Sequence, residues 1–176
     1  MSIKQQLVRI LLRGMKEVYM DRIISDKLYL SLLYRRVLDK KMHWDNPCTF
    51  NEKLQWLKIY NRRNEYTQMV DKIAVKKIVA EKLGEKYIIP TLGVWDDFDD
   101  IDFSILPDRF VLKCNHDSGS ICICKNKNTF DIAEARKKMR KGLKQNLYWA
   151  GREWPYKDVK PRILAEKFME DEGGDG

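Results

Sequence analysis

Long apolar segments are missing from this sequence of 176 residues. No stretch approaches the roughly eighteen apolar residues that a membrane-spanning helix needs, and Met1 is not followed by the pattern of a secretory signal peptide. Cysteines are also few, four in all. Cys122 and Cys124 would share one face of a strand, where they are poorly placed to bridge each other. We therefore expect no disulfide framework, and a reduced, cytoplasmic chain.

Recognisable metal and nucleophile patterns are missing as well. The aspartates of the segment 96–102 lack the glycine and the distal glutamate of a helix–loop–helix calcium site. Cys114, His116, Cys122 and Cys124 suggest zinc, yet Cys122 and Cys124 are separated by one residue, where structural zinc sites place about two to four. A cysteine and His116 could also form a nucleophile and base, but no third orienting group can be identified. The pattern therefore assigns no metal ligand and no catalytic residue.

The composition indicates a globular chain with an anionic partner. Apolar residues make up 44% and aromatic residues 11%, which is enough for a packed core. The net charge of +8 is unevenly placed: residues 1–60 carry +6, 61–90 carry +3, 91–110 carry −5, 111–162 carry +8 and 163–176 carry −4. A basic body with an acidic insert fits a nucleotide, an acidic polymer such as a polysaccharide, or a membrane surface as partner. An ordinary solvated surface has the same charge pattern.

Two helices are expected at the amino-terminal end. The segment 3–20 places apolar residues at helical spacing, with basic residues on its other faces. Such a helix can pack its apolar side on the core, which is the more common outcome, or lie on an anionic membrane. A second helix is expected over 26–39. The apolar positions of the first helix are Ile3, Leu7, Ile10, Leu11, Met15 and Val18.

Capping signals predict the helices that follow. Thr49 and Glu52 form a capping box, so a helix should begin at Phe50 and run to about Tyr60. Asp71 is a candidate N-cap for a further helix that ends at Gly84. A strand is expected over 87–95, and a basic helix over 132–147. No known nucleic-acid motif accompanies this basic helix, which argues against nucleic-acid binding.

The segment 109–125 predicts a strand, a tight loop and a second strand. In the loop, Gly119 between Ser118 and Ser120 lets the backbone turn its N–H groups toward an anion. Lys113 ends the first strand beside that loop, where its ammonium group could meet the same anion. We interpret the unit as a nucleotide-phosphate clamp, against the alternative of an ordinary polar hairpin.

Residues elsewhere in the chain support the nucleotide interpretation. Lys72 begins a helix and would supply a second ammonium group. Glu166 and Lys167 lie on a strand expected over 162–169, where a carboxylate could accept the adenine amino group. The predicted fold class is α/β (α+β): a helical amino-terminal region followed by a small mixed or antiparallel sheet. We expect a helical region over 1–60, a helix, a strand and an acidic loop over 61–107, a partial nucleotide-binding subdomain over 108–171 and a disordered tail over 172–176.

These residues resemble the TupA-like ATP-grasp family, which is named for teichuronopeptide synthesis and is common in bacterial surface-polysaccharide gene clusters. The resemblance covers about 39–171. It is carried by the segments 46–58 (NPCTFNEKLQWLK), 71–72 (DK), 110–120 (FVLKCNHDSGS), 153–156 (EWPY) and 163–168 (ILAEKF).

The resemblance implies an ATP-dependent carboxylate–amine ligase. Lys72 and Lys113 would contact the ATP phosphates, and Ser118, Gly119 and Ser120 would form the flexible loop over them. Glu166, Lys167 and Met169 would line the adenine pocket, the last two through backbone groups.

Magnesium is expected for such enzymes, on strands that follow the adenine-binding strand. Here the candidates that remain are in the tail, where Glu172 and Asp175 lie on a glycine-rich end, so we expect an amino-terminal portion of the ligase that is inactive alone. A missing carboxy-terminal half or a second subunit would then complete it. Two alternatives remain. One is a non-catalytic basic module that binds an acidic surface polymer or a membrane surface, and that lies at the inner face of the membrane. The other is a glycosyltransferase-associated protein, because members are often labelled glycosyltransferases.

Overall fold

The structure is a computed structural model that describes residues 3–17 and 22–170. The chain divides into two compact units, one of residues 1–64 with 147–157 and one of residues 65–146 with 158–176. The first unit is helical and the second carries a four-stranded antiparallel sheet, so the predicted α/β fold class is confirmed. None of the helices in the described part of the chain is long and apolar enough to cross a membrane.

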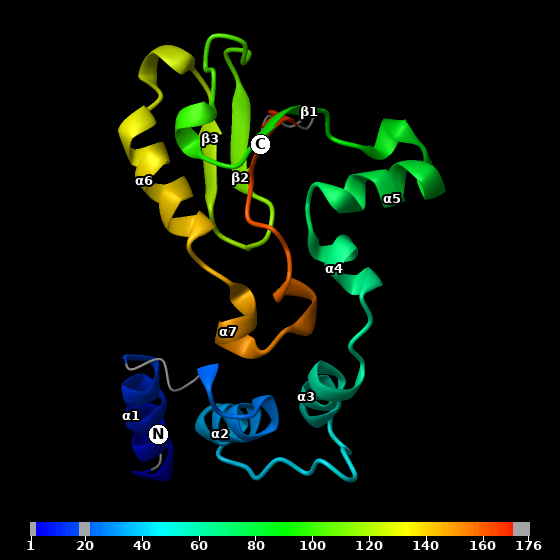
Figure 1. The fold of residues 1–176 in the computed structure, drawn as a ribbon, viewed down its shortest axis with the longest axis vertical. Helices are drawn as coiled ribbons and strands as arrows, with labels where there is room; N and C mark the ends of the chain where they lie inside the picture. The colour runs from blue at the N-terminus through cyan, green and yellow to red at the C-terminus, as the bar shows by residue number, and fades with distance from the viewer. Residues whose placement is uncertain (1–2, 18–21, 171–176) are drawn as a thin grey trace. The chain divides into compact units, whose positions relative to one another are not determined.

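The helical unit (Figure 1) contains helices whose amino-terminal ends are set by capping side chains. Thr49 accepts a hydrogen bond from the Glu52 backbone N–H and Glu52 accepts one in return, so the predicted capping box is confirmed. Ser25 caps α2 in the simpler way, by accepting from the Leu28 N–H. The elements are α1 (Ile3–Glu17), α2 (Asp26–Leu38), α3 (Phe50–Tyr60), α7 (Leu147–Gly151) and the 3-10 turn η5 (Trp154–Tyr156).

The amino-terminal helix packs differently from the more common expectation. Leu12 is buried against Tyr29 of α2, with Val8 beside it. Four of the apolar residues that were predicted to pack on the core are exposed to solvent instead. For these four residues the prediction is wrong. Val18 lies outside the described residues. The exposed positions are Ile3, Leu7, Ile10 and Leu11.

A buried arginine joins α7 to α2. The Arg152 side chain is fully buried, its guanidinium lies 4.1 Å from the Tyr29 ring centroid, and its Nε is 2.9 Å from Asp26 Oδ1. Asp26 also accepts a hydrogen bond from the Tyr148 hydroxyl at 2.6 Å. A buried cation of this kind is tolerated because a carboxylate and aromatic faces replace its water shell.

The second unit holds the sheet, in the order β1-β4-β2-β3 with every pair antiparallel. The predicted hairpin is confirmed, because β2 and β3 pair over four residues on each strand. The strands are β1 (Thr91–Trp95), β2 (Phe110–Cys114), β3 (Ile121–Cys124) and β4 (Ile163–Lys167). The helices are α4 (Glu65–Val70), α5 (Ala74–Leu83) and α6 (Ile132–Leu143), with 3-10 turns η2 (Glu85–Tyr87), η3 (Phe98–Asp100) and η4 (Lys127–Thr129).

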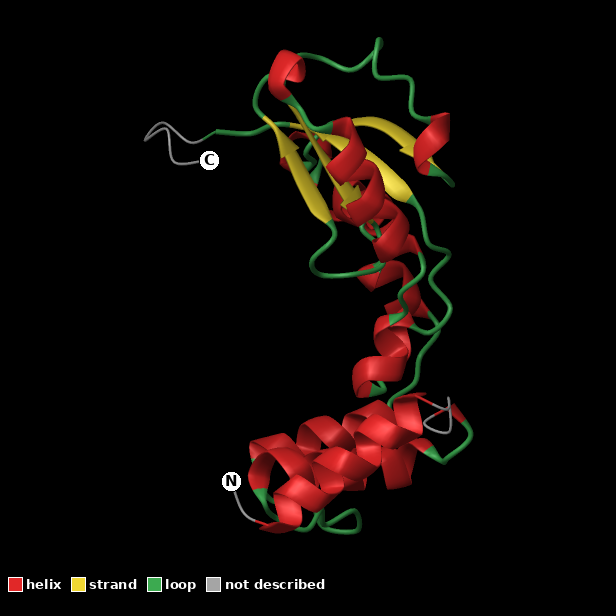
Figure 2. Ribbon diagram, turned by 90° about the vertical axis from the view of Figure 1, so that its left-hand side faces the viewer, coloured by secondary structure: helices red, strands yellow, loops and turns green. Residues whose placement is uncertain are grey.

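One face of the sheet forms the core against α6 (Figure 2). Alternation along the strands sends one set of side chains to this face and the other set to the opposite face. Phe103 and Phe130 pack against this core and meet Phe110 and each other in tilted or edge-to-face contacts. The buried core residues are Phe98, Ile101, Leu106, Phe110, Leu112, Cys114, Cys124, Ala135, Met139, Ile163 and Ala165.

Three predicted element boundaries differ from the structure. The strand expected over 87–95 begins only at Thr91, because residues 85–87 form a 3-10 turn and Pro90 precedes the strand. The basic helix ends at Leu143, and α7 begins separately at Leu147. Asp71 is not the N-cap of α5, which begins at Ala74. Its Oδ1 accepts from the Ile73 N–H in the turn before the helix.

Candidate functional site

The candidate site lies on the sheet face opposite α6. Lys113 of β2 and Glu166 of β4 both project there, because Val111, two residues before Lys113, is the register partner of Glu166. The Lys113 Nζ is 2.7 Å from Glu166 Oε2. The sequence analysis placed these two residues in one site, and the structure brings them together.

A pocket of about 280 Å³ opens over this pair. Helix α5 forms one wall, and the segment that leads from η2 into β1 forms another. The pocket therefore combines a charged floor with apolar walls, as is typical of small-molecule sites. Its lining residues are Lys72, Val75, Lys76, Val79, Tyr87, Ile88, Ile89, Lys113 and Glu166.

Lys76 is a site residue that the sequence analysis missed. Its Nζ is 2.5 Å from Glu166 Oε1 and donates hydrogen bonds to Ile89 O at 2.7 Å and to Thr91 Oγ1 at 2.8 Å. It therefore ties α5 to the start of β1 and to β4. The available signal was its spacing: Lys76 follows Lys72 by four residues, so the two would share a face of the helix predicted to begin after Asp71.

The carboxylate of Glu166 is buried between two ammonium groups. Burial alone pushes the pKa of Glu166 upward, but the hydrogen bonds from Lys113 and Lys76 together outweigh it and lower the pKa below its ordinary value of 4.5. Glu166 is thus ionised at neutral pH. The net charge of the two lysines and this carboxylate is +1, which suits an anionic ligand.

Lys72 also reaches the pocket, but its ammonium group is largely occupied. The Nζ donates to Cys114 O at 3.1 Å, to Asn115 O at 3.4 Å and to Asp117 O. Burial lowers the pKa of Lys72, an effect that the nearby Asp117 carboxylate opposes. These contacts make Lys72 an anchor for the loop that follows β2.

The predicted loop residues divide into two exposed and one buried. Ser118 and Gly119 are exposed, whereas Ser120 is buried and its hydroxyl donates to the Asp117 carboxylate. The end of the loop lies close to α6: a Cβ added at Gly142 would come within 2.7 Å of the Ser120 Cβ. The three residues do not line the pocket over Glu166 in this conformation.

Asn115 fixes the start of the same loop. Its Nδ2 donates to Asp71 Oδ1 and to Lys160 O, both at 3.0 Å, and its Oδ1 accepts from the Arg162 N–H at 2.7 Å. The backbone N–H of Lys72 donates to Asn115 O at 3.1 Å. This fully buried amide therefore connects three segments that surround the site.

Lys167 and Met169 lie beyond the pocket. The Lys167 backbone N–H is already used, because it donates to Pro90 O at 3.0 Å. A backbone hydrogen bond from Lys167 to a ligand would therefore use its carbonyl oxygen. Both side chains are exposed, and neither lines the pocket.

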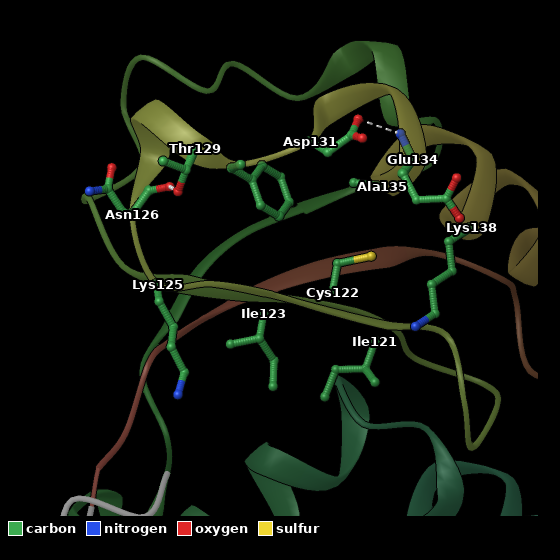
Figure 3. A pocket seen from close by; sticks show the side chains of 11 residues that line it. Ile121, Cys122, Ile123, Lys125, Asn126, Thr129, Asp131, Glu134, Ala135 and Lys138 are labelled. Carbon is green, nitrogen blue, oxygen red and sulfur yellow. Dashed lines mark hydrogen bonds between the residues drawn. The ribbon is translucent and has the colours of Figure 1, made fainter.

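A second pocket of about 500 Å³ lies between β3 and α6. Figure 3 shows Cys122 directed to its α6 side, whereas Ile121 and Ile123 point away to the other side of the strand. The charged residues that line it are of both signs, two lysines and two carboxylates, and none of the predicted site residues is among them. We therefore place the candidate site at the smaller pocket.

The cysteines and His116 do not gather as ligands. Burial raises the pKa of Cys114 to about 12, so its thiol stays protonated, and His116 Nε2 lies 3.0 Å from Gln145 O. Within residues 3–17 and 22–170, no three His, Cys, Asp or Glu side chains are placed to hold a metal ion. In the acidic run, Asp97 and Asp99 instead pair with Arg140, and Asp99 also with Arg136.

A family model described as TupA-like ATPgrasp matches residues 52–175. No curated protein and no solved structure matches the chain.

Proposed function

Because this chain belongs to the TupA-like ATP-grasp family, we propose that it binds ATP in the pocket over Glu166, as the nucleotide site of an ATP-dependent carboxylate–amine ligase. The observation that carries the proposal is the buried Glu166 carboxylate, held by Lys76 and Lys113 at the floor of an apolar-walled pocket. Cationic groups and apolar walls together suit a ligand with a polyphosphate and a flat base.

The three lysines of the site have different tasks in this proposal. Lys76 directs its donors to Glu166, Ile89 O and Thr91 Oγ1, and Lys72 directs its donors to the loop carbonyls. Within the described part of the chain, the structure pairs Lys113 with Glu166 alone. An ammonium group has three donors, so Lys113 keeps the capacity to bind a phosphate oxygen while Lys72 and Lys76 act as positioning residues.

The base of the nucleotide would lie against the apolar walls. Val75 and Val79 of α5 and the adjacent Ile88 and Ile89 supply these walls. Each Glu166 oxygen meets one lysine, which leaves lone pairs that could accept an adenine amino group. The backbone carbonyl of Lys167 could meet the ring edge, and Ser118 and Gly119 could close over the phosphates by a movement of the loop.

The substrate class completes the proposal. In a complete carboxylate–amine ligase, ATP bound at such a site would supply the phosphoryl group that activates a carboxylate for attack by an amine. We propose that the acid and amine belong to a bacterial surface polysaccharide of the teichuronopeptide type and that the chain works at the inner face of the membrane. Family membership supports this part of the proposal.

No group of three His, Cys, Asp or Glu side chains within residues 3–17 and 22–170 is placed to hold magnesium, and Asp99 and Glu166 are paired with arginine and lysine side chains. We propose instead that residues 3–17 and 22–170 bind the nucleotide without turning it over.

Thermal unfolding with and without ATP tests the nucleotide site. Saturating ATP should raise the Tm by about 5–11 °C, which is the effect of a ligand at roughly a hundred times its Kd on a chain of this size. Lys113→Met should abolish the rise, measured against its own ligand-free Tm. The matched control is Lys137→Met, because Lys137 is a largely exposed lysine on α6 away from the pocket, and it should keep the full rise. Absence of a rise in the unaltered chain would overturn the proposal.

Nucleotide turnover is measured separately. Protein, ATP, magnesium and mixtures of carboxylates and amines should release no ADP above a protein-free control. Steady ADP release that Lys113→Met abolishes would refute binding without turnover while supporting the nucleotide site itself.

A further inference from the structure

We infer that the exposed apolar row of α1 inserts into the surface of an anionic lipid bilayer. We define the α1 row as Ile3, Leu7, Ile10 and Leu11. All four are exposed in the structure, and the inference does not rest on nucleotide binding.

The α1 row is a continuous face of the helix. At about 100° per residue, its four members fall within an arc of about 100°. Gly14 continues the same row, and a Cβ added there would meet open space. The row is therefore a smooth apolar surface that no described part of the chain covers.

A different side of the same helix attaches it to the unit. Leu12 is buried against Tyr29, with Val8 beside it, about 100° or more around the helix from the centre of the row. Helix α1 thus has two apolar sides, one used for packing on α2 and one left exposed. Figure 1 shows α1 and α2 as neighbouring blue helices.

Charge decides between the possible occupants of the row. Residues 1–17 contain four basic residues and one acidic residue, and the first turn of α1 has no acidic residue. A second copy of α1 would bring the same positive charge and be repelled. An acidic polysaccharide would satisfy the charge but would offer no apolar phase. An anionic bilayer supplies both, with negative charge at its surface for the basic segment and acyl chains for the row.

Vesicle co-sedimentation of the full chain tests the inference. Vesicles of phosphatidylcholine with about a third phosphatidylglycerol should bind the protein, and pure phosphatidylcholine vesicles should bind it at least about tenfold more weakly. Raising the salt concentration should weaken binding to the anionic vesicles, because exposed charges are screened. Equal binding to both vesicle types, or no binding to either, would overturn the inference.

A matched pair of double variants locates the contact. Leu7 and Ile10 are 62% and 68% exposed, and Leu83 and Ile105 in the other unit are 63% and 68% exposed. Leu7→Ser with Ile10→Ser should weaken binding to anionic vesicles by about tenfold or more, because two apolar side chains no longer enter the acyl region. Leu83→Ser with Ile105→Ser should leave it unchanged. Equal losses of vesicle binding in the two double variants would overturn the bilayer assignment. So would a dimer that sedimentation velocity detects at high salt in the unaltered chain and in the Leu83/Ile105 variant but not in the Leu7/Ile10 variant.

The nucleotide assay separates this inference from the proposed function. The α1 double variant should keep the full rise in Tm with ATP, since Lys113 and Glu166 lie in the other unit. A chain that binds vesicles but shows no rise in Tm with ATP would support the membrane contact and overturn the nucleotide site. A chain whose Tm rises with ATP but that binds no vesicles would support the nucleotide site and overturn the membrane contact.

Discussion

Lys113 and Glu166 meet diagonally across the β2–β4 pair, with 2.7 Å between the lysine Nζ and the carboxylate Oε2. Each strand alone places its charged residue among apolar neighbours, and only the antiparallel register brings the two together. Lys76 completes the arrangement from α5. The site thus depends on three elements that are distant in sequence, which makes it sensitive to changes in any one of them.

Glu166→Gln should lower the free energy of unfolding by about 2 kcal/mol at pH 7. A fully buried ion pair loses about 3–5 kcal/mol when one partner is removed, but here both lysines keep some solvent contact. Because the pKa of Glu166 is lowered in the folded state, its stabilising effect is present above the ordinary pKa of 4.5 and is lost as the pH falls through the folded value. Urea unfolding at pH 7 and at pH 4 or below should therefore show the variant and the unaltered chain converging in acid. A difference that grows in acid would contradict the lowered pKa.

Gly142→Ala should destabilise the sheet unit by about 1–3 kcal/mol. The new Cβ would lie 2.7 Å from Ser120 Cβ and 2.8 Å from Cys114 Sγ, so α6 would have to move away from β2 and its loop. Gly14→Ala is the matched control, because that helical glycine has open space around its Cβ position. The control should be neutral or stabilising by up to about 1 kcal/mol. Equal effects of the two substitutions would show that α6 and the loop are not in close contact.

Sequence patterns within short segments predicted the helices and strands of this fold better than they predicted which other elements pack on them. The hairpin of β2 and β3 and the capping box of Thr49 and Glu52 follow from residues close in sequence, and both were predicted correctly. The apolar periodicity of α1 was also recognised. Periodicity shows that a face exists but not whether another element packs on it, so the exposure of Leu7 and Ile10 could not be derived.

The candidate site shows the same distinction. Lys113 and Glu166 could be singled out because each interrupts an apolar strand with a charge, which needs a partner when buried. Lys76 lies on a helix with several other lysines, where a charge is normally solvated. Its contact with Glu166 arises from the packing of α5 near β4, and only the structure shows it. The engagement of Lys72 with the carbonyls of Cys114, Asn115 and Asp117 is likewise a product of the folded loop.

Asn115→Asp should lower the free energy of unfolding by about 2–4 kcal/mol. The substitution replaces the Nδ2 donor with an oxygen that faces Asp71 Oδ1 and Lys160 O, so one buried and one part-buried acceptor lose their donor. Asn126→Asp is the matched control, because the Asn126 side chain acts as an acceptor for the Asn128 N–H, a role that aspartate keeps. Chemical denaturation of both variants measures the difference. A loss at Asn126 as large as that at Asn115 would contradict this hydrogen-bond assignment.

Glu52→Gln should remove a pH-dependent part of the stability of the helical unit. The hydrogen bond from the Thr49 backbone N–H, followed by that from His43 at 2.8 Å, lowers the pKa of Glu52 from 4.5 to about 2. A carboxylate whose pKa is lowered on folding stabilises the fold above its unfolded pKa and loses that effect as the pH falls through the folded value. The Tm of the unaltered chain should therefore exceed that of Glu52→Gln by a few degrees at pH 6, and the difference should shrink between pH 4.5 and about pH 2. Glu85→Gln, at an exposed glutamate, should leave the Tm unchanged throughout. A constant difference between the unaltered chain and Glu52→Gln over this range would show that Glu52 acts by hydrogen-bond geometry alone and not through its charge.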